Sequence, residues 1–154
     1  MLLVRPYAAA DLDDLIALFR DSVRQVAHLD YSLEQVLAWA PDEIDHEAWV
    51  LRLAASSAWL AAHGDRTAGF VTIEPDGHID MLYVHAALQR HGIASKLLER
   101  VEISARSRGL ARLFTQASIT ARPFFERRGF TVIQEQSVVR RGQKFANFRM
   151  DRSV

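Results

Sequence analysis

Two neighbouring stretches decide the fold of this sequence: Ile79-Asp80-Met81-Leu82-Tyr83-Val84, and Gln89-Arg90-His91-Gly92-Ile93-Ala94 a few residues later. The first stretch is mostly apolar and predicts a strand. After the second, apolar residues recur on one helical face up to residue 108, which predicts a long helix. The residues of this apolar face are Ile93, Leu97, Leu98, Val101 and Ala105. A basic turn that contains one glycine therefore joins a strand to the start of a helix.

This turn has the properties of an anion-binding site. The first turn of a helix has backbone N–H groups without partners and carries the positive end of the helix dipole. Gly92 lets the backbone approach a ligand closely, and Arg90 and Lys96 add positive charge, so we expect a pyrophosphate here. Taken alone, the hexapeptide also fits a glycine that only completes a turn. The sequence contains neither the dinucleotide motif G-x-G-x-x-G nor the nucleoside triphosphate motif G-x-x-x-x-G-K-[ST].

The hexapeptide resembles the Q/R-x-x-G-x-G/A acyl-CoA signature of the GCN5-related N-acetyltransferases. A second segment, Ala121 to Phe130, resembles the A-x-x-F-Y-E-x-x-G-F motif of the same family. Two motifs in this order and at this separation are more specific than either alone, and the resemblance covers nearly the whole chain. It implies one α+β domain over residues 1–154, with a mostly antiparallel central sheet of about seven strands. Helices would cover both faces, and one strand–helix–strand crossover would be parallel.

The composition is that of a soluble globular domain without a nucleic-acid or membrane partner. Nineteen basic residues balance nineteen acidic ones, whereas a nucleic-acid binder usually has a basic excess. Cysteine is absent, which excludes thiol catalysis and disulfides and suits the cytoplasm. No apolar run approaches the roughly 20 residues of a membrane span, and the sequence begins on a strand-like segment without a signal peptide. We therefore expect a cytoplasmic protein.

Local patterns predict the remaining elements. Apolar stripes and turn residues separate helical from extended stretches along the whole chain. Helices are expected from residue 11, from residue 32 to Pro41, over 42–55 and over 123–128, besides the long helix over 93–108. Strands are expected at 2–6, 58–62, 68–73, 78–84, 113–117, 130–139 and 144–150, with a hairpin turn at 140–143.

The resemblance implies acetyl-CoA as the cofactor and assigns residues to it. Its pantetheine would lie between the fourth and fifth strands and pair with the backbone, where a main-chain N–H would polarise the thioester carbonyl. The strand residues in this role are Leu82, Tyr83 and Val84. The pyrophosphate would lie at Gln89, Arg90, His91, Gly92, Ile93, Ala94 and Ser95. Ser118, Phe124 and Phe125 complete the predicted cofactor-binding set.

Three residues of the fourth strand are the catalytic candidates. His78 is the first candidate for the base that deprotonates the amine, because a free histidine has a pKa of about 6.5; the alternative is an exposed turn residue. Asp80 would share the face of His78 and either pair with a base or orient His78, or else be a cation-paired or solvated carboxylate. Tyr83 would lie on the opposite face, where a core position is favoured.

One departure from the family motif concerns the acid that protonates the leaving thiolate. Many family members carry a tyrosine for this task at the position that Phe125 occupies here, and a phenyl ring cannot donate a proton. Ser118, Thr115, Tyr83 or a water would have to act instead. Alternatively no general acid is needed, because a thiol is already fairly acidic, with a pKa of about 8.5 for cysteine. No metal site is expected, since the histidines lack ligand spacing.

The sequence therefore predicts an acetyl-CoA-dependent N-acetyltransferase in which the acceptor amine attacks directly. A small-molecule or amino-acid-like amine is preferred as the acceptor, and its wall is expected from the loop at residues 28–31, the second helix and the last strands. The alternatives are a non-catalytic acyl-CoA-binding module and a protein N-terminal acetyltransferase. A homodimer is possible because the family often pairs through terminal strands.

Overall fold

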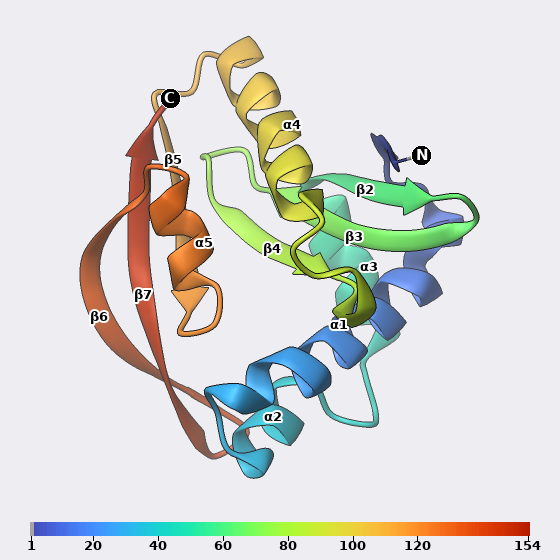
Figure 1. Cartoon of the computed structure of the whole chain (residues 1–154), viewed down its shortest axis with the longest axis vertical. Helices are drawn as coiled ribbons and strands as arrows, with labels where there is room; N and C mark the ends of the chain where they lie inside the picture. Colours follow the sequence, from blue (N-terminus) through green and yellow to red (C-terminus); the bar gives the residue numbers. More distant parts are fainter. Residues whose placement is uncertain (1) are drawn as a thin grey trace.

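The structure is a computed structural model that describes residues 2–154 (Figure 1). Strands and helices follow in the predicted order, and no helix in the described chain is long and apolar enough to cross a membrane. The helices are α1 (Leu12–Val26), α2 (Leu33–Trp39), α3 (His46–Ala54), α4 (Ile93–Ser107) and α5 (Arg122–Arg127). The strands are β1 (Leu2–Pro6), β2 (Ser57–His63), β3 (Arg66–Ile73), β4 (Ile79–Val84), β5 (Arg112–Ser118), β6 (Thr131–Arg140) and β7 (Gln143–Ser153).

The seven strands form two antiparallel sheets that meet between β4 and β5. One sheet has the order β1-β2-β3-β4 and the other the order β5-β7-β6. The chain passes from β4 through α4 to β5, and His78 and Phe114 form a parallel bridge at the beginning of the two strands. Within residues 2–154 this bridge is the one β-pair between the sheets, so the strands separate beyond it. The predicted mixed sheet with one parallel crossover is confirmed.

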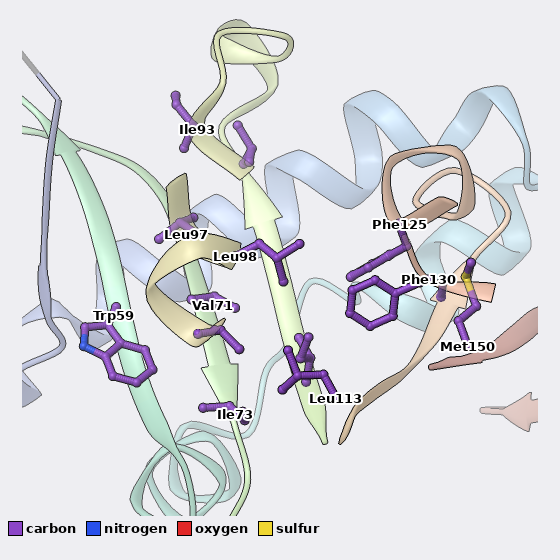
Figure 2. Packing of buried hydrophobic residues seen from close by; sticks show 14 of the residues in the cluster. Trp59, Val71, Ile73, Ile93, Leu97, Leu98, Leu113, Phe125, Phe130 and Met150 are labelled. Carbon is purple, nitrogen blue, oxygen red and sulfur yellow. The ribbon is translucent and has the colours of Figure 1, made fainter. Parts of the chain in front are cut away.

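Helix α4 packs on one face of the four-stranded sheet. All five residues of the predicted apolar stripe, from Ile93 to Ala105, are buried. Leu97 and Leu98 lie against Val71 of β3 and near Leu113 of β5, as Figure 2 shows. The same core continues into the second sheet through Phe125, Phe130 and Met150. One helix therefore packs against both sheets and fixes the crossover between them.

Helices α1 and α3 pack on the opposite face of the four-stranded sheet, and α2 lies between α1 and β7 of the second sheet (Figure 1). The buried stripe of α1 includes Leu15 and Phe19, which belong to a second core together with Phe70 of β3 and Met81 of β4. Phe19 makes edge contacts with the rings of neighbouring aromatic residues at centroid distances near 5 Å, for example 5.0 Å to Tyr83. The sheet thus separates an α4 core from an aromatic core.

A β-bulge interrupts β4 at Asp80. Thr72 is opposite Met81, but its neighbour Ile73 is opposite Ile79, which leaves Asp80 as an extra residue. Ile79 consequently packs in the α4 core, whereas Met81 packs in the aromatic core. A bulge redirects side chains in this way because it breaks strict alternation. The expectation that Asp80 and Tyr83 face opposite sides is therefore wrong: both line one cavity.

The last two strands form the predicted hairpin, and it docks on α2. Arg141 and Gly142 both have positive φ angles, +46° and +78°, as a two-residue hairpin turn requires. The Arg141 guanidinium donates to the carbonyl of Ala38 at 2.6 Å, and the Gln35 amide donates to the carbonyl of Lys144 at 2.6 Å. These bonds hold the hairpin tip against the second helix.

Candidate active site

A large cleft of about 880 Å³ opens where β4 and β5 separate. Both strands, the start of α4 and helix α5 contribute to its walls. The predicted cofactor residues come together here, with the exception of His91, which is exposed and lies outside the lining. Those that line the cleft are Leu82, Tyr83, Val84, Gln89, Arg90, Gly92, Ile93, Ala94, Ser95, Ser118, Phe124 and Phe125.

The start of α4 presents free backbone N–H groups to this cleft. Gly92 has φ +75° and Arg90 has φ +64°, a left-handed turn immediately before the helix. The first intrahelical bond runs from the Lys96 N–H to the Gly92 carbonyl at 3.1 Å, so the preceding N–H groups have no partner within the helix. The Gln89 amide donates to the Val84 carbonyl at 2.8 Å and fixes the turn on the end of β4.

Positive charge surrounds this helix start. Arg90, Arg127 and Arg128 all line the cleft, and the Arg128 guanidinium donates to the hydroxyl of Ser95 in the first turn of α4. Lys96, the other cation expected here, is exposed and lies outside the lining. The helix dipole and the three guanidinium groups together favour a polyanion at this end of the cleft.

A second, smaller cavity of about 290 Å³ adjoins the cleft on the side of the aromatic core. Its walls come from the residues before α2, from α2 and α3, and from the β6–β7 hairpin, which include the segments predicted to form the acceptor wall. The aromatic side chains in its lining are Phe19, Tyr31, Trp39, Trp49, Tyr83 and Phe145. The cavity and the cleft share five lining residues, and the two spaces meet there: Trp39, Asp80, Tyr83, Gln116 and Ser118.

His78 lies beside this junction and is held from both sides. Its Nδ1 is 2.5 Å from a carboxylate oxygen of Glu74, and its Nε2 is 2.6 Å from the side-chain oxygen of Gln116. The ring stacks on Phe114 at a centroid distance of 5.1 Å, and the side chain is 19% exposed. His78 is thus a half-buried, oriented residue. It does not itself line either cavity, and Gln116 connects it to both.

Asp80 pairs with a cation and does not orient His78. The Arg52 guanidinium of α3 makes two hydrogen bonds to its carboxylate, at 2.5 and 2.8 Å. Of the roles considered for Asp80, the cation-paired carboxylate is the one that the structure has, and Glu74 is the carboxylate that orients His78. Ligand atoms of Glu74, His78 and Asp80 lie within 4.8 Å of one another, but each of the three side chains is already engaged by a protein partner.

Sequence reasoning missed Glu74, Gln116 and Arg52. Glu74 was the easiest of the three to predict, because Glu74 and His78 flank the turn at Pro75–Gly77. Their backbones pair across this turn, where the Glu74 N–H donates to the His78 carbonyl at 2.8 Å. A short hairpin places such flanking side chains together. Gln116 and Arg52 come from distant segments, and no local pattern marks them.

Of the three hydroxyl groups considered as proton donors, that of Thr115 is already used as a donor in the fold, whereas those of Ser118 and Tyr83 are not. Thr115 donates its hydroxyl hydrogen to the Ile79 carbonyl at 2.9 Å, so this hydrogen is committed to the fold. The Ser118 hydroxyl accepts from the Ala121 N–H at 3.0 Å, and the Tyr83 hydroxyl accepts from the Trp39 indole N–H at 3.3 Å. Within residues 2–154 neither of these two hydroxyls donates to a protein acceptor.

Burial raises the pKa of Tyr83 above its ordinary value of 10.0. The Trp39 hydrogen bond and the charges of Arg52 and Arg140 oppose this effect. The phenol therefore stays protonated at neutral pH and retains a hydrogen to donate. Phe125, by contrast, is 3% exposed and packs against the rings of Phe124 and Phe130.

Comparisons with known proteins agree on one family. Residues 27–152 match the family described as "Acetyltransferase (GNAT) domain". The chain is 40% identical over 147 residues to the uncharacterized N-acetyltransferase YafP of Escherichia coli K12, covering 96% of this chain and 93% of YafP. A GCN5-related N-acetyltransferase from Rhodopseudomonas palustris superimposes with a TM-score of 0.95 at 33% identity, covering 99% and 95% of the two chains.

More distant structures share the fold. The PaiA N-acetyltransferase of Thermoplasma acidophilum, solved in complex with coenzyme A, has a TM-score of 0.83 at 17% identity. The alignment covers 100% of this chain and 99% of the PaiA chain. The architecture of two sheets that separate at the fourth and fifth strands is therefore one that solved acetyltransferases have.

Proposed function

Because the chain belongs to the GNAT family of N-acetyltransferases, we propose that it transfers the acetyl group of acetyl-CoA to the primary amine of a small, amino-acid-like molecule by direct attack. The meeting of two cavities at Asp80, Tyr83, Gln116 and Ser118 carries this proposal. The larger space suits an extended cofactor, and the smaller suits an acceptor. An amine in the smaller cavity would reach a thioester at the junction without a covalent enzyme intermediate.

The cofactor end of this proposal rests on the start of α4. Free N–H groups, the glycine turn and three arginines form an anion site at one end of the cleft, where the pyrophosphate would bind. One edge of β4 pairs with β3, and its other edge faces the cleft beyond the bridge at His78. Backbone groups of successive strand residues point to opposite edges, and His85 pairs with Ala68 of β3, so Tyr83 also faces β3. The groups that would be available to the pantetheine amides are those of Leu82 and the N–H of Val84, because the Val84 carbonyl accepts from Gln89.

The size and location of the smaller cavity support a small acceptor. About 290 Å³ is at the lower end of the roughly 300–1,000 Å³ typical of small-molecule sites. The hairpin tip is tied to α2 by the bonds of Arg141 and Gln35, which keeps one wall of the cavity in place. A fixed wall suits one compact molecule better than peptides of varying sequence.

We assign proton removal to His78. Glu74 fixes the hydrogen of the ring on Nδ1, which leaves Nε2 as the nitrogen that takes up a proton. Gln116 lies between Nε2 and the junction, and rotation of its amide plane exchanges the oxygen and nitrogen that face the ring. A water that takes the place of this amide at Nε2 would connect the acceptor ammonium to the ring, so Gln116 would have to turn away before the proton is transferred. Asp80, neutralised by Arg52, would shape the junction without accepting a proton.

We assign protonation of the leaving thiolate to Tyr83. Tyr83 lines both cavities, and its hydroxyl accepts from Trp39 and keeps its own hydrogen for another partner. Ser118 occupies the same junction and is the second candidate. Tyr83 is preferred because a phenol is a much stronger acid than an alcohol, even with the pKa of this phenol raised by burial.

A panel of amines tests the function as a whole. With acetyl-CoA, we expect thiol release and an acetylated product for small amino-acid-like amines, at rates at least tenfold above those for peptides with free N-termini. A free-thiol assay and mass spectrometry of the products measure both. Binding of acetyl-CoA without turnover of any amine would favour a non-catalytic acyl-CoA-binding protein, and acetylation of peptides alone would favour an N-terminal acetyltransferase.

We expect Gly92→Val to weaken acetyl-CoA binding about tenfold or more. A β-branched residue at φ +75° costs about 1–3 kcal/mol of strain, and relief of this strain would move the N–H groups out of position. Isothermal calorimetry measures the dissociation constant. Gly64→Val is the matched control, because Gly64 has φ +63° and equally open surroundings in the turn between β2 and β3. Unchanged affinity in Gly92→Val would refute the pyrophosphate position.

We expect His78→Ala to lower kcat about 100-fold with little change in acetyl-CoA affinity, since general-base catalysis typically contributes about 10² to 10⁴. The wild-type rate should fall on the acid side, because a protonated imidazole cannot accept the proton. The variant should lack this acid limb in a pH–rate profile. The control is His63→Ala, an exposed histidine at the end of β2. An identical acid limb in the variant would remove His78 as the base.

We expect Tyr83→Phe to lower kcat about tenfold, less than the usual general-acid effect because a thiolate is already a good leaving group. The KM for acetyl-CoA should stay within about twofold of the wild-type value, since the packing of the ring is retained. Tyr7→Phe makes the same chemical change at a half-buried tyrosine outside both cavities. A larger loss in Ser118→Ala than in Tyr83→Phe would transfer the role to Ser118.

A further inference from the structure

Two arginines at the tip of the β6–β7 hairpin define what the acceptor carries besides its amine. We propose that the acceptor bears a carboxylate, bound by Arg140 and Arg141, and that a flat apolar spacer separates this carboxylate from the reacting nitrogen. This inference rests on the proposed function, because it names the substrate class of the same smaller cavity.

The charge of this cavity is unbalanced. Its charged lining residues are Arg52, Asp80, Asp45, Arg140 and Arg141. Arg52 and Asp80 neutralise each other, and Asp45 is engaged at the start of α3, where it accepts from the Ala48 N–H at 3.1 Å. Within residues 2–154 neither Arg140 nor Arg141 has a carboxylate partner. Two guanidinium groups are therefore available to an anion.

The hairpin presents these two groups at one end of the cavity. Arg140 and Arg141 line the smaller cavity but not the cleft, whereas the junction residues line both. The bond from Arg141 to the Ala38 carbonyl uses one guanidinium nitrogen and leaves further N–H groups free. Guanidinium groups match a carboxylate through paired hydrogen bonds.

Asn147 supplies a polar group near the other end of the smaller cavity, where this cavity meets the cleft. Its side-chain oxygen Oδ1 is buried and has no hydrogen-bond partner, which is costly unless a ligand supplies one. Asn147 is opposite Ser118 in the register of β5 and β7, so it stands next to the junction. An N–H of the acceptor amine is a suitable donor for this oxygen. The amine end and the anion end are thereby assigned to different parts of the cavity.

Aromatic side chains also line the smaller cavity, in addition to the polar groups at its two ends. The rings of Tyr31, Trp39 and Phe145 contact one another at centroid distances of 5.6 to 6.2 Å. Phe145 and Asn147 are two residues apart on β7 and so face the same side, with the hairpin turn just before Phe145. Such a surface stabilises a flat apolar spacer. A polyamine fits poorly, because a second ammonium would lie beside unpaired guanidinium groups.

Three amines of similar size test the proposal: para-aminomethylbenzoate, benzylamine and para-xylylenediamine. We expect the carboxylate compound to bind the coenzyme A-loaded protein at least tenfold more tightly than benzylamine, and the diamine to bind least tightly. Calorimetry measures binding without requiring turnover, and acetylation rates under the same conditions should follow the same order. A hydrogen-bonded charge pair of about 1.5–3 kcal/mol corresponds to a factor of ten or more.

The variants separate charge recognition from loss of structure. Arg140→Ala should weaken aminomethylbenzoate binding about tenfold and leave benzylamine and acetyl-CoA unchanged. Arg149→Ala is the control, because Arg149 is an exposed arginine on the same hairpin outside both cavities. Asn147→Ala should weaken both amines equally and preserve the preference for the carboxylate.

Two results overturn the proposal and remain distinguishable from failure of the enzyme assignment. If benzylamine binds and reacts as well as the carboxylate compound, the anion site is refuted while the acetyltransferase function stands. The same conclusion follows if Arg140→Ala weakens both compounds equally. If acetyl-CoA itself does not bind to the wild-type protein, the proposed function fails and the inference fails with it.

Discussion

The bridge between His78 and Phe114 is the constraint on which the site depends. Neighbouring parallel strands usually pair along their length, but here β4 and β5 pair at their beginnings and then separate. The Thr115 hydroxyl bond to the Ile79 carbonyl reinforces the closed end. Residues of α4 share one hydrophobic core with residues of both sheets, so the sheets stay connected where their strands no longer pair. The fold therefore contains a cleft that has β4 and β5 on its two sides and the N-terminus of α4 at one end.

The bulge at Asp80 follows directly after this closed end and lies where the cleft meets the smaller cavity. Without the extra residue, Asp80 would face the α4 core, where an ionised carboxylate is costly. The bulge turns it toward Arg52, and Tyr83 lines the same cavity. Two adjacent irregularities, the bridge and the bulge, thus accompany two cavities, the cleft and the smaller cavity, which share the lining residues of the junction. Regular strands would have kept the two spaces apart.

Sequence reasoning predicted the parts of this arrangement that are local. The helix after Gly92 and the short strands have periodic patterns, and the glycine turn is a property of consecutive residues, so their positions agree closely with the structure. The bulge could not be predicted, because it depends on how β4 pairs with β3. The partners of His78 and Asp80 were missed for the same reason, since Gln116 and Arg52 approach from segments distant in sequence.

The replacement of the usual tyrosine by Phe125 has a physical explanation in the same geometry. Phe125 is almost fully buried against Phe124 and Phe130, and it contributes an apolar side chain to the lining of the cleft. The hydroxyl of Tyr83 accepts from the Trp39 indole N–H and donates to no acceptor within residues 2–154. Under the proposed function, this hydroxyl would supply the proton that the usual tyrosine supplies in other family members. The phenol would then act from β4, on the wall shared by the two cavities, and α5 would contribute only an apolar side chain at Phe125.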